Sequence, residues 1–268
     1  MIKVFFVVFA NPLPDEAYYW LWSKNRALSY FDHPPLAAWL QAFLFSLSDN
    51  KYFAVRALPV ISLGFVLAII IAWQRIMYKR LNYGLCLKCV VLFLAFPIYA
   101  IFFSISFPDH LLITLLFASS FFLFLYFETN SKLSHRIYYW YLAILFFSLA
   151  LLTKYNAVLL GMGVLAYISY YKKQIEGPSF VHIFISIIMI ALIQMPVLLW
   201  NISNDFASFS FHMVERLDQG KNFLAVFYNI VGFISGVIIA FSPIFIFNLK
   251  NNYSSEDYSE SRKSFIKD

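Results

Sequence analysis

The stretch F-V-H-I-F-I-S-I-I-M-I-A-L-I-Q-M-P-V-L-L-W at residues 180–200 decides the fold class. It contains no Asp, Glu, Lys or Arg. As a helix it is long enough to cross the hydrocarbon core of a bilayer, which needs about 20 apolar residues. Sustained period-two alternation is absent, and lipid does not tolerate open sheet edges. Similar apolar runs lie at residues 57–74, 89–107, 111–127, 137–153, 155–171 and 222–248. The sequence therefore predicts an all-α protein with about seven membrane spans.

The composition of the chain agrees with an integral membrane protein. Hydrophobic residues make up 62% of the 268 residues and charged residues only 13%, whereas about a quarter of the residues of a soluble domain are charged. These values exclude a soluble globular domain, a disordered chain and a nucleic-acid-binding module, so no nucleic acid is expected as a partner. The net charge of +6 is explained by basic cytoplasmic loops.

The connections between the apolar runs alternate in charge. The segments 75–88, 128–136 and 172–179 together contain eight basic residues and two acidic ones. The segments 11–56, 106–110, 153–154 and 201–221 contain eight of the fourteen acidic residues of the chain. The positive-inside rule places the basic set in the cytoplasm and the acidic set outside. We therefore expect a multi-pass inner-membrane protein with a transmembrane domain over residues 1–249 and a polar cytoplasmic tail over 250–268.

The longest external connection, residues 11–56, begins with two adjacent carboxylates. It reads L-P-D-E-A-Y-Y-W-L-W-S from Leu13 to Ser23, with Asp15 and Glu16 next to Pro14. Such a sequence can simply be an interfacial helix, since Pro and acidic residues favour the first turn. Carboxylates that are partly desolvated at a membrane interface are also suited to general-base catalysis. Both interpretations stay open at this point.

A second polar element follows in the same loop. Asp32 and His33 precede Pro34 and Pro35, and prolines hold the residues before them in extended backbone, which presents these side chains outside a helix. Asp32 is therefore a candidate site residue. The alternative is that it caps a helix running from Pro35 to Leu47.

Two further charged residues lie where external loops meet spans. Asp109 follows Pro108 and is either an N-cap or part of a site. Lys154 sits between two apolar runs with almost no loop, so it either extends to the interface or binds an anion such as a lipid phosphate. His135, His182 and His212 are scattered singly and are interpreted as incidental.

These segments together resemble a known family. D-E-A-Y-Y-W at 15–20 with Y-F-D-H-P-P-L at 30–36 is similar to the first external loop of bacterial glycosyltransferases that use polyprenyl-phosphate sugars, the family of protein O-mannosyltransferases and the lipid A aminoarabinose transferase. P-D at 108–109 and L-T-K-Y-N-A-V-L at 152–159 resemble later elements of that family. The segments M-P-V-L-L-W-N at 195–201 and N-D-F-A-S-F at 204–209 continue the match in order.

The resemblance implies a membrane domain of the C-type glycosyltransferase fold with an external active site. The donor would be a polyprenyl-phosphate sugar, and the acceptor an external glycan, lipid or protein. By position in the motifs, Asp15 would be the base, with Glu16 beside it. Lys154 and Tyr155, with His33, would lie at the donor phosphate, and Asp32 and Asp109 would shape the sugar or acceptor site. The resemblance implies no particular cofactor, but some relatives bind a divalent cation near this turn, for which Asp32 and His33 are candidate ligands.

Two features depart from the family pattern. The start of the chain, residues 1–10, is shorter than a complete first span, and the chain ends after about seven spans. We therefore expect a shortened copy of the transferase. The alternatives are a transporter or flippase and an inactive remnant of the enzyme. Membrane lipids are the remaining expected partners.

Overall fold

A computed structural model describes residues 11, 13–47, 51–79, 81–128, 133–171, 175–215, 227, 228, 230–232 and 235. In these ranges the chain forms helices and loops without a strand, so the predicted all-α class is confirmed. The principal helices are α2 (Pro14–Lys24), α3 (Leu36–Leu47), α4 (Lys51–Met77), α5 (Tyr83–Ala95), α6 (Pro97–Phe102), α7 (Pro108–Glu128), α8 (Leu133–Leu151), α9 (Val158–Tyr171) and α10 (Phe180–Ser203). Short turns of helix follow at η1 (Tyr155–Ala157), α11 (Ala207–Ser210) and η2 (Phe211–Glu215).

The apolar runs of the sequence mostly correspond to single helices. Ala54–Met77, Pro108–Glu128 and Phe180–Ser203 are long and apolar enough to cross a membrane. The run 89–107 does not form the single span that was predicted, because α5 ends at Ala95 and α6 begins at Pro97. Proline has no N–H to donate and its ring clashes with the preceding turn of a helix. The predicted seventh span, 222–248, lies mostly outside the described residues, and the tail 250–268 lies wholly outside them.

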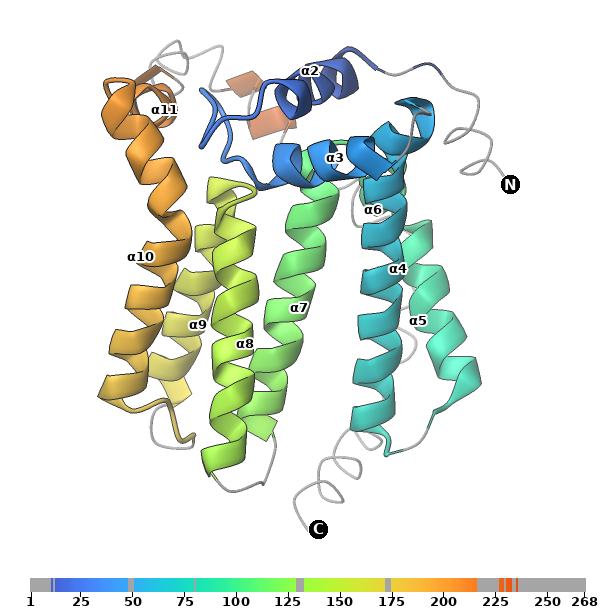
Figure 1. The fold of residues 1–268 in the computed structure, drawn as a ribbon. Helices are drawn as coiled ribbons and strands as arrows, with labels where there is room; N and C mark the ends of the chain where they lie inside the picture. Colours follow the sequence, from blue (N-terminus) through green and yellow to red (C-terminus); the bar gives the residue numbers. More distant parts are fainter. Residues whose placement is uncertain are drawn as a thin grey trace.

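The long helices stand side by side, and α2 and α3 lie across one end of the bundle (Figure 1). The ends of α4, α7 and α9 lie at the opposite end, which is where the basic connections leave the bundle (Figure 1). The joints between α6 and α7 and between α8 and α9 lie below α2 and α3. This alternation matches the arrangement predicted from loop charge.

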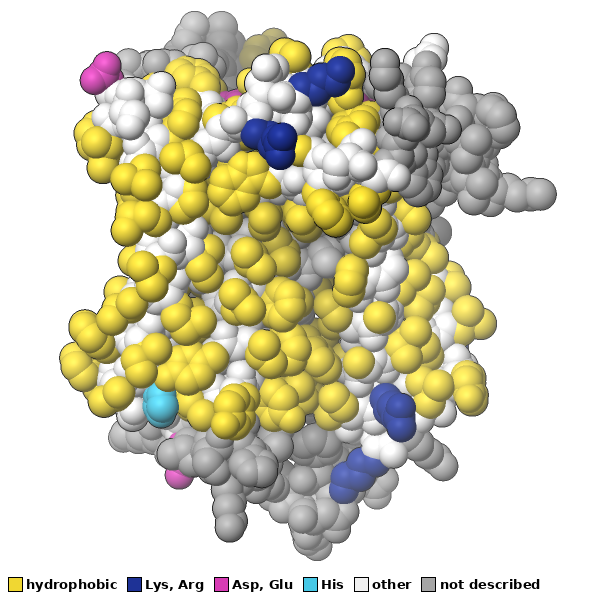
Figure 2. Space-filling model, in the orientation of Figure 1, with side chains coloured by type: hydrophobic (Ala, Val, Ile, Leu, Met, Phe, Trp, Pro, Cys, Tyr) yellow, Lys and Arg dark blue, Asp and Glu magenta, His cyan; other side chains and the backbone are white. Residues whose placement is uncertain are grey.

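The outside of the bundle is apolar around its middle. Figure 2 shows hydrophobic side chains covering the flank between the two ends, with basic side chains gathered near the ends. Large exposed hydrophobic residues of the described helices include Leu159, Leu165, Phe184 and Leu192. Such a surface is stable only against lipid or another apolar partner, which agrees with a membrane protein.

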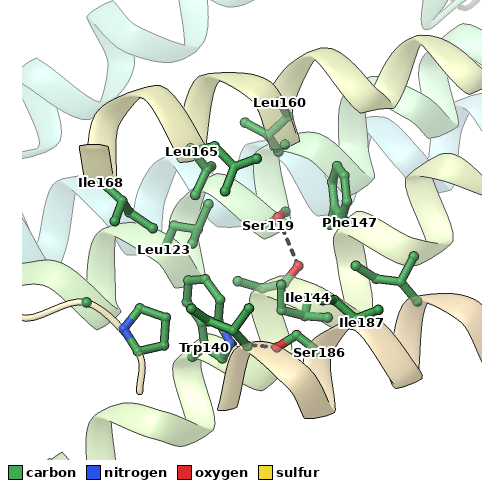
Figure 3. A pocket seen from close by; sticks show the side chains of 17 residues that line it. Ser119, Leu123, Trp140, Ile144, Phe147, Leu160, Leu165, Ile168, Ser186 and Ile187 are labelled. Atoms are coloured by element: carbon green, nitrogen blue, oxygen red, sulfur yellow. Dashed lines mark hydrogen bonds between the residues drawn. The ribbon is translucent and has the colours of Figure 1, made fainter. Parts of the chain in front are cut away.

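A cavity of about 360 Å³ lies between α7, α8, α9 and α10 (Figure 3). Its walls are almost entirely apolar, and the few polar groups are paired with one another. Ser119 Oγ donates to the Ala143 carbonyl at 2.9 Å, and Trp140 Nε1 donates to Ser186 Oγ at 2.8 Å. The cavity therefore presents no unsatisfied polar group to an occupant.

Candidate active site

The loop between α2 and α3 is a compact turn that presents Asp32 and His33. The Tyr30 amide donates to the His33 carbonyl at 3.1 Å, and Pro34 and Pro35 are buried. The first amide of α3, that of Leu36, donates to the Leu152 carbonyl at 3.0 Å. The interpretation of Asp32 as the cap of α3 is therefore wrong, because its carboxylate has other partners.

The Asp32 carboxylate has one hydrogen-bond donor and one charged neighbour. Tyr18 Oη donates to Asp32 Oδ1 at 3.2 Å, and His33 Nδ1 lies 3.3 Å from Asp32 Oδ2. Burial would raise the pKa of Asp32, but the hydrogen bonding and charge of His33 and the hydrogen bond from Tyr18 outweigh it, so the pKa falls below its ordinary value. Burial and the nearby Asp32 charge raise the pKa of Tyr18 to about 12. Asp32 is thus held as a carboxylate and Tyr18 as a neutral donor.

Lys154 lies at the break between α8 and α9. Its backbone is extended there, with φ −158° and ψ 133°, which interrupts the helix. The Nζ atom lies 2.8 Å from Asp109 Oδ1, and the two side chains are only 25% and 21% exposed. Asp109 is the second residue of α7 rather than its N-cap, so the capping alternative for this residue is also wrong.

These elements enclose a polar pocket of about 210 Å³ at the α2–α3 end of the bundle. The side chains that line it are Tyr19, Asp32, His33, Lys154, Tyr155, Asn156 and His212. Four of the residues predicted from the sequence, Asp32, His33, Lys154 and Tyr155, are therefore brought together, and Asp109 joins them through Lys154. A partly enclosed cationic group beside carboxylates and imidazoles suits recognition of a phosphorylated sugar.

His212 reaches the pocket from the far end of the described chain. Its Nε2 lies 3.0 Å from the Asp32 carbonyl, and its ring packs edge-on against Tyr155 with centroids 5.0 Å apart. The expectation that His212 is incidental is wrong. His182, by contrast, contacts the Tyr141 hydroxyl at 2.7 Å on the flank of the bundle, away from the pocket, and the His135 side chain lies outside the described residues.

The end of α10 explains how His212 arrives there. The fully buried Asn201 accepts a 2.7 Å hydrogen bond from the Phe206 amide on its carbonyl and one from Phe209 on its side chain. Asp205 and Phe206 have positive φ angles of 51° and 56°, which reverse the chain after α10. Left-handed backbone is costly for such residues, so the Asn201 contacts are needed to hold the turn.

Glu16 and Asp15 have opposite environments although they are adjacent. The Glu16 side chain is buried, with Arg56 Nη2 2.9 Å from its Oε2 and Arg56 Nε 3.2 Å from its Oε1. The Ser106 amide also donates to Oε1 at 3.0 Å, and the Leu13 amide donates to Oε2 at 2.9 Å. Through these four donors the Glu16 carboxylate connects α2 to α4 and to the α6–α7 loop. This environment does not favour the catalytic role predicted for Glu16.

Asp15 is exposed in the first turn of α2. One turn further along the helix lies Tyr19, which lines the pocket. Burial is the main cause that raises the pKa of the Tyr19 phenol, and the nearby charge of Asp15 contributes to the same rise. Asp15 thus lies on the face of α2 that carries Tyr19. The carboxylate is solvated and not buried in an ion pair, in contrast to Glu16.

The residues of the pocket offer two adjacent metal ligands, Asp32 and His33, as the sequence suggested. Within the described ranges no three His, Cys, Asp or Glu side chains come close enough to hold a metal ion. Two ligands are fewer than a stable divalent-cation site uses. The described residues of the pocket therefore do not form a divalent-cation site, and the proposed chemistry uses the side chains alone.

The arrangement of the helices defines the fold class of the protein, which is the C-type fold found in membrane glycosyltransferases. The crystal structure of ArnT from Cupriavidus metallidurans in the apo state superimposes with a TM-score of 0.64 at 15% identity, over 80% of this chain and 42% of that chain. The ArnT structure bound to undecaprenyl phosphate gives a TM-score of 0.65 at 15% identity, over 79% and 42%. These likenesses confirm the predicted fold.

Residues 32–200 match the model of the family described as dolichyl-phosphate-mannose-protein mannosyltransferase, and the chain belongs to that family. It is also similar to the lipid A galacturonosyltransferase RgtD of Rhizobium johnstonii, with 27% identity over 233 residues. That match covers 81% of this chain and 46% of the relative, so the chain spans about half the length of this relative. The family resemblance seen in the sequence motifs is confirmed.

Proposed function

We propose that this protein is a membrane glycosyltransferase that moves a sugar from a polyprenyl-phosphate donor to an acceptor outside the cytoplasm. The single observation that carries the proposal is the pocket in which Lys154, Asp32 and His33 meet at the α2–α3 end of the bundle. Its relatives support the donor class, since one modifies lipid A and a structural neighbour binds undecaprenyl phosphate. The transporter alternative is not retained, because the pocket lies at one end of the bundle and not at its midplane, where transporter sites lie.

Lys154 is the residue suited to the donor phosphate. An ammonium has three donors, and Asp109 occupies one of them, which fixes the side chain while two donors stay available for phosphate oxygens. His33 and Tyr155 line the same pocket and are placed to contact the phosphate or the sugar. Holding the charge in a partly enclosed site strengthens its attraction to a phosphate relative to bulk water.

The chemistry is a single displacement at the anomeric carbon. The acceptor hydroxyl oxygen forms a bond to that carbon while the bond from the carbon to the phosphate oxygen breaks, and the electron pair leaves with the polyprenyl phosphate. A base takes the acceptor proton, and the configuration inverts. We assign the base to Asp15, whose carboxylate is free of the ion pair that occupies Glu16. Asp32, kept ionised by its neighbours, positions the sugar or acceptor hydroxyls.

We base the proposed acceptor and location on the relatives and on loop charge. A lipid acceptor such as lipid A agrees with the named activity of the Rhizobium relative, while a glycan or a protein remains within the range of acceptors that the family suggests. We place the protein in the inner membrane with the pocket facing the periplasm, because the basic connections lie at the opposite end of the bundle.

The test is a turnover assay of the full chain in proteoliposomes. Undecaprenyl-phosphate sugars carrying a radiolabel in the sugar are supplied with lipid A, and label in lipid A and free undecaprenyl phosphate are measured together. The proposal predicts that the two products appear in equal amounts and that both are lost in Lys154→Ala. Donor that is carried across the bilayer intact, with no undecaprenyl phosphate released, would instead support a transporter.

A further inference from the structure

A second groove lies at the other end of the bundle from the polar pocket. It has a volume of about 510 Å³ and is walled by α4, α5, Tyr99 of α6 and Phe117 of α7. Trp73, Gln74 and Met77 contribute one face of the end of α4, and Cys89 and Phe93 contribute one face of α5. The walls are apolar except near Gln74.

Gln74 is the unusual residue in this groove. Its side chain is only 5% exposed, yet neither the Nε2 nor the Oε1 atom has a hydrogen-bond partner among the residues that the structure describes. Burying an amide without partners is unfavourable, and buried polar groups in proteins are nearly always paired. The unpaired amide is therefore available to a ligand that enters the groove.

The other glutamines of the described ranges, Gln41 and Gln194, have hydrogen-bond partners. Gln41 Nε2 donates to the Ala54 carbonyl at 2.8 Å, and its Oε1 accepts from Ser106 Oγ at 2.8 Å. Gln194 Nε2 donates to the Ser148 carbonyl at 2.8 Å. The cavity shown in Figure 3 likewise has its polar groups paired internally. Gln74 thus differs from the other described glutamines in having no hydrogen-bond partner. Its groove differs from the cavity of Figure 3 in containing an unpaired polar group.

The surroundings of the groove are positively charged. Arg75, Lys79 and Lys88 are exposed on the same two helices and their connection, and Figure 2 shows basic side chains near the lower end of α4. The sequence contains no Asp or Glu between residues 51 and 108. Positive charge around an apolar groove at a membrane interface selects an anionic amphiphile, and basic pockets between helices on the cytoplasmic side bind anionic lipid headgroups.

We propose that this groove binds one anionic phospholipid from the leaflet at the basic end of the bundle. An acyl chain lies against the apolar walls, and Gln74 Nε2 donates to an ester carbonyl at the boundary between the chains and the headgroup. The phosphate lies among the basic side chains. This site is separate from the polar pocket and does not depend on the proposed transferase activity.

The test measures lipid binding to the purified full chain by native mass spectrometry in detergent. The wild-type protein is titrated with dioleoylphosphatidylglycerol and with dioleoylphosphatidylcholine. We expect one tightly bound phosphatidylglycerol and a preference for it of about fivefold or more, since each basic residue near the surface contributes about one such factor. Equal affinity for the two lipids would overturn the assignment of an anionic ligand.

The decisive variant is Gln74→Leu, which has a similar volume but no amide. Binding of phosphatidylglycerol should weaken about fivefold to tenfold, the usual worth of one hydrogen bond. Gln194→Leu is the matched control, because it removes a helical glutamine outside the groove, and its lipid binding should match the wild type. If Gln74→Leu binds phosphatidylglycerol like the wild type, the amide does not contact the lipid and the proposal is wrong.

Discussion

The Nζ atom of Lys154 lies 2.8 Å from Oδ1 of Asp109, which joins the break between α8 and α9 to the first turn of α7. Both side chains are about four-fifths buried, and Lys154 also lines the polar pocket. The contact fixes a cation at the position where a donor phosphate would be bound. A side chain that is already ordered loses less conformational entropy on binding.

Lys154→Ala should weaken binding of undecaprenyl phosphate to the purified protein. Loss of a charge-assisted contact in a partly desolvated site costs about 1.5–3 kcal/mol, which is roughly a tenfold to hundredfold rise in Kd. Lys154→Arg keeps the charge and should lose less. Titration with fluorescent undecaprenyl phosphate measures both, and an unchanged Kd in Lys154→Ala would mean that the lysine only extends to the interface.

Asp109→Asn tests whether Asp109 only positions Lys154 or contacts the donor directly. The amide oxygen still accepts from Lys154, while one negative charge is removed from the vicinity of the phosphate, so donor binding should be equal to or tighter than that of the wild type. The same titration decides the matter. A loss as large as that of Lys154→Ala would show that the Asp109 carboxylate itself contacts the donor.

Glu16→Ala should destabilise the fold far more than Asp15→Ala. Removing Glu16 leaves Arg56 without the carboxylate that it contacts at 2.9 Å, and breaking a buried ion pair costs about 3–5 kcal/mol. Asp15 is exposed, and its replacement should change the free energy of unfolding by about 0.5 kcal/mol or less. Denaturation in mixed micelles compares the two variants. Similar losses would contradict the structural role of Glu16.

The contacts of Asp32 predict a pH dependence of stability. Because the pKa of Asp32 is lowered in the folded protein, the ionised carboxylate stabilises the fold above its unfolded pKa of about 3.9, and this contribution is lost as the pH falls through the folded value. Thermal unfolding between about pH 6 and pH 3 should show a smaller loss of stability in Asp32→Asn than in the wild type. Parallel curves would mean that Asp32 gains nothing from Tyr18 and His33.

The general fold could be predicted because apolar runs of about 20 residues and the charge of their connections both depend on local sequence. The helix break at Pro97 also depends on local sequence. It was not predicted because Pro97 lies within a continuous apolar run, which by itself indicates one span. The family resemblance of the motifs predicted Asp32, His33 and Lys154 as one site, and the structure brings all three into one pocket at the end of the bundle where the external connections meet.

Other parts of the site depend on contacts between distant segments. Arg56 pairs with Glu16 across 40 positions, and His212 meets Asp32 across 180. No spacing rule predicts such pairs from a single sequence. The turn at Asn201, which directs His212 into the pocket, could have been suspected from an amide residue followed closely by Asn204 and Asp205, since these residue types favour reversals of the chain.

Asp15 is proposed to accept the proton of the acceptor during sugar transfer, and Asp15→Asn removes this ability. Asparagine keeps the size of the side chain and is also accepted in the first turn of a helix, but it cannot act as the base. Glu16→Gln is a poor control here because it disturbs the Arg56 contact. Glu128→Gln replaces it, because Glu128 is an exposed carboxylate at the last residue of α7, far from the pocket. In proteoliposomes with labelled donor, Asp15→Asn should lower the transfer rate by roughly 10²–10⁴ while the Kd for undecaprenyl phosphate stays at the wild-type value. Wild-type rates of transfer in Asp15→Asn would show that Asp15 is not the base and is only a residue of the interfacial helix.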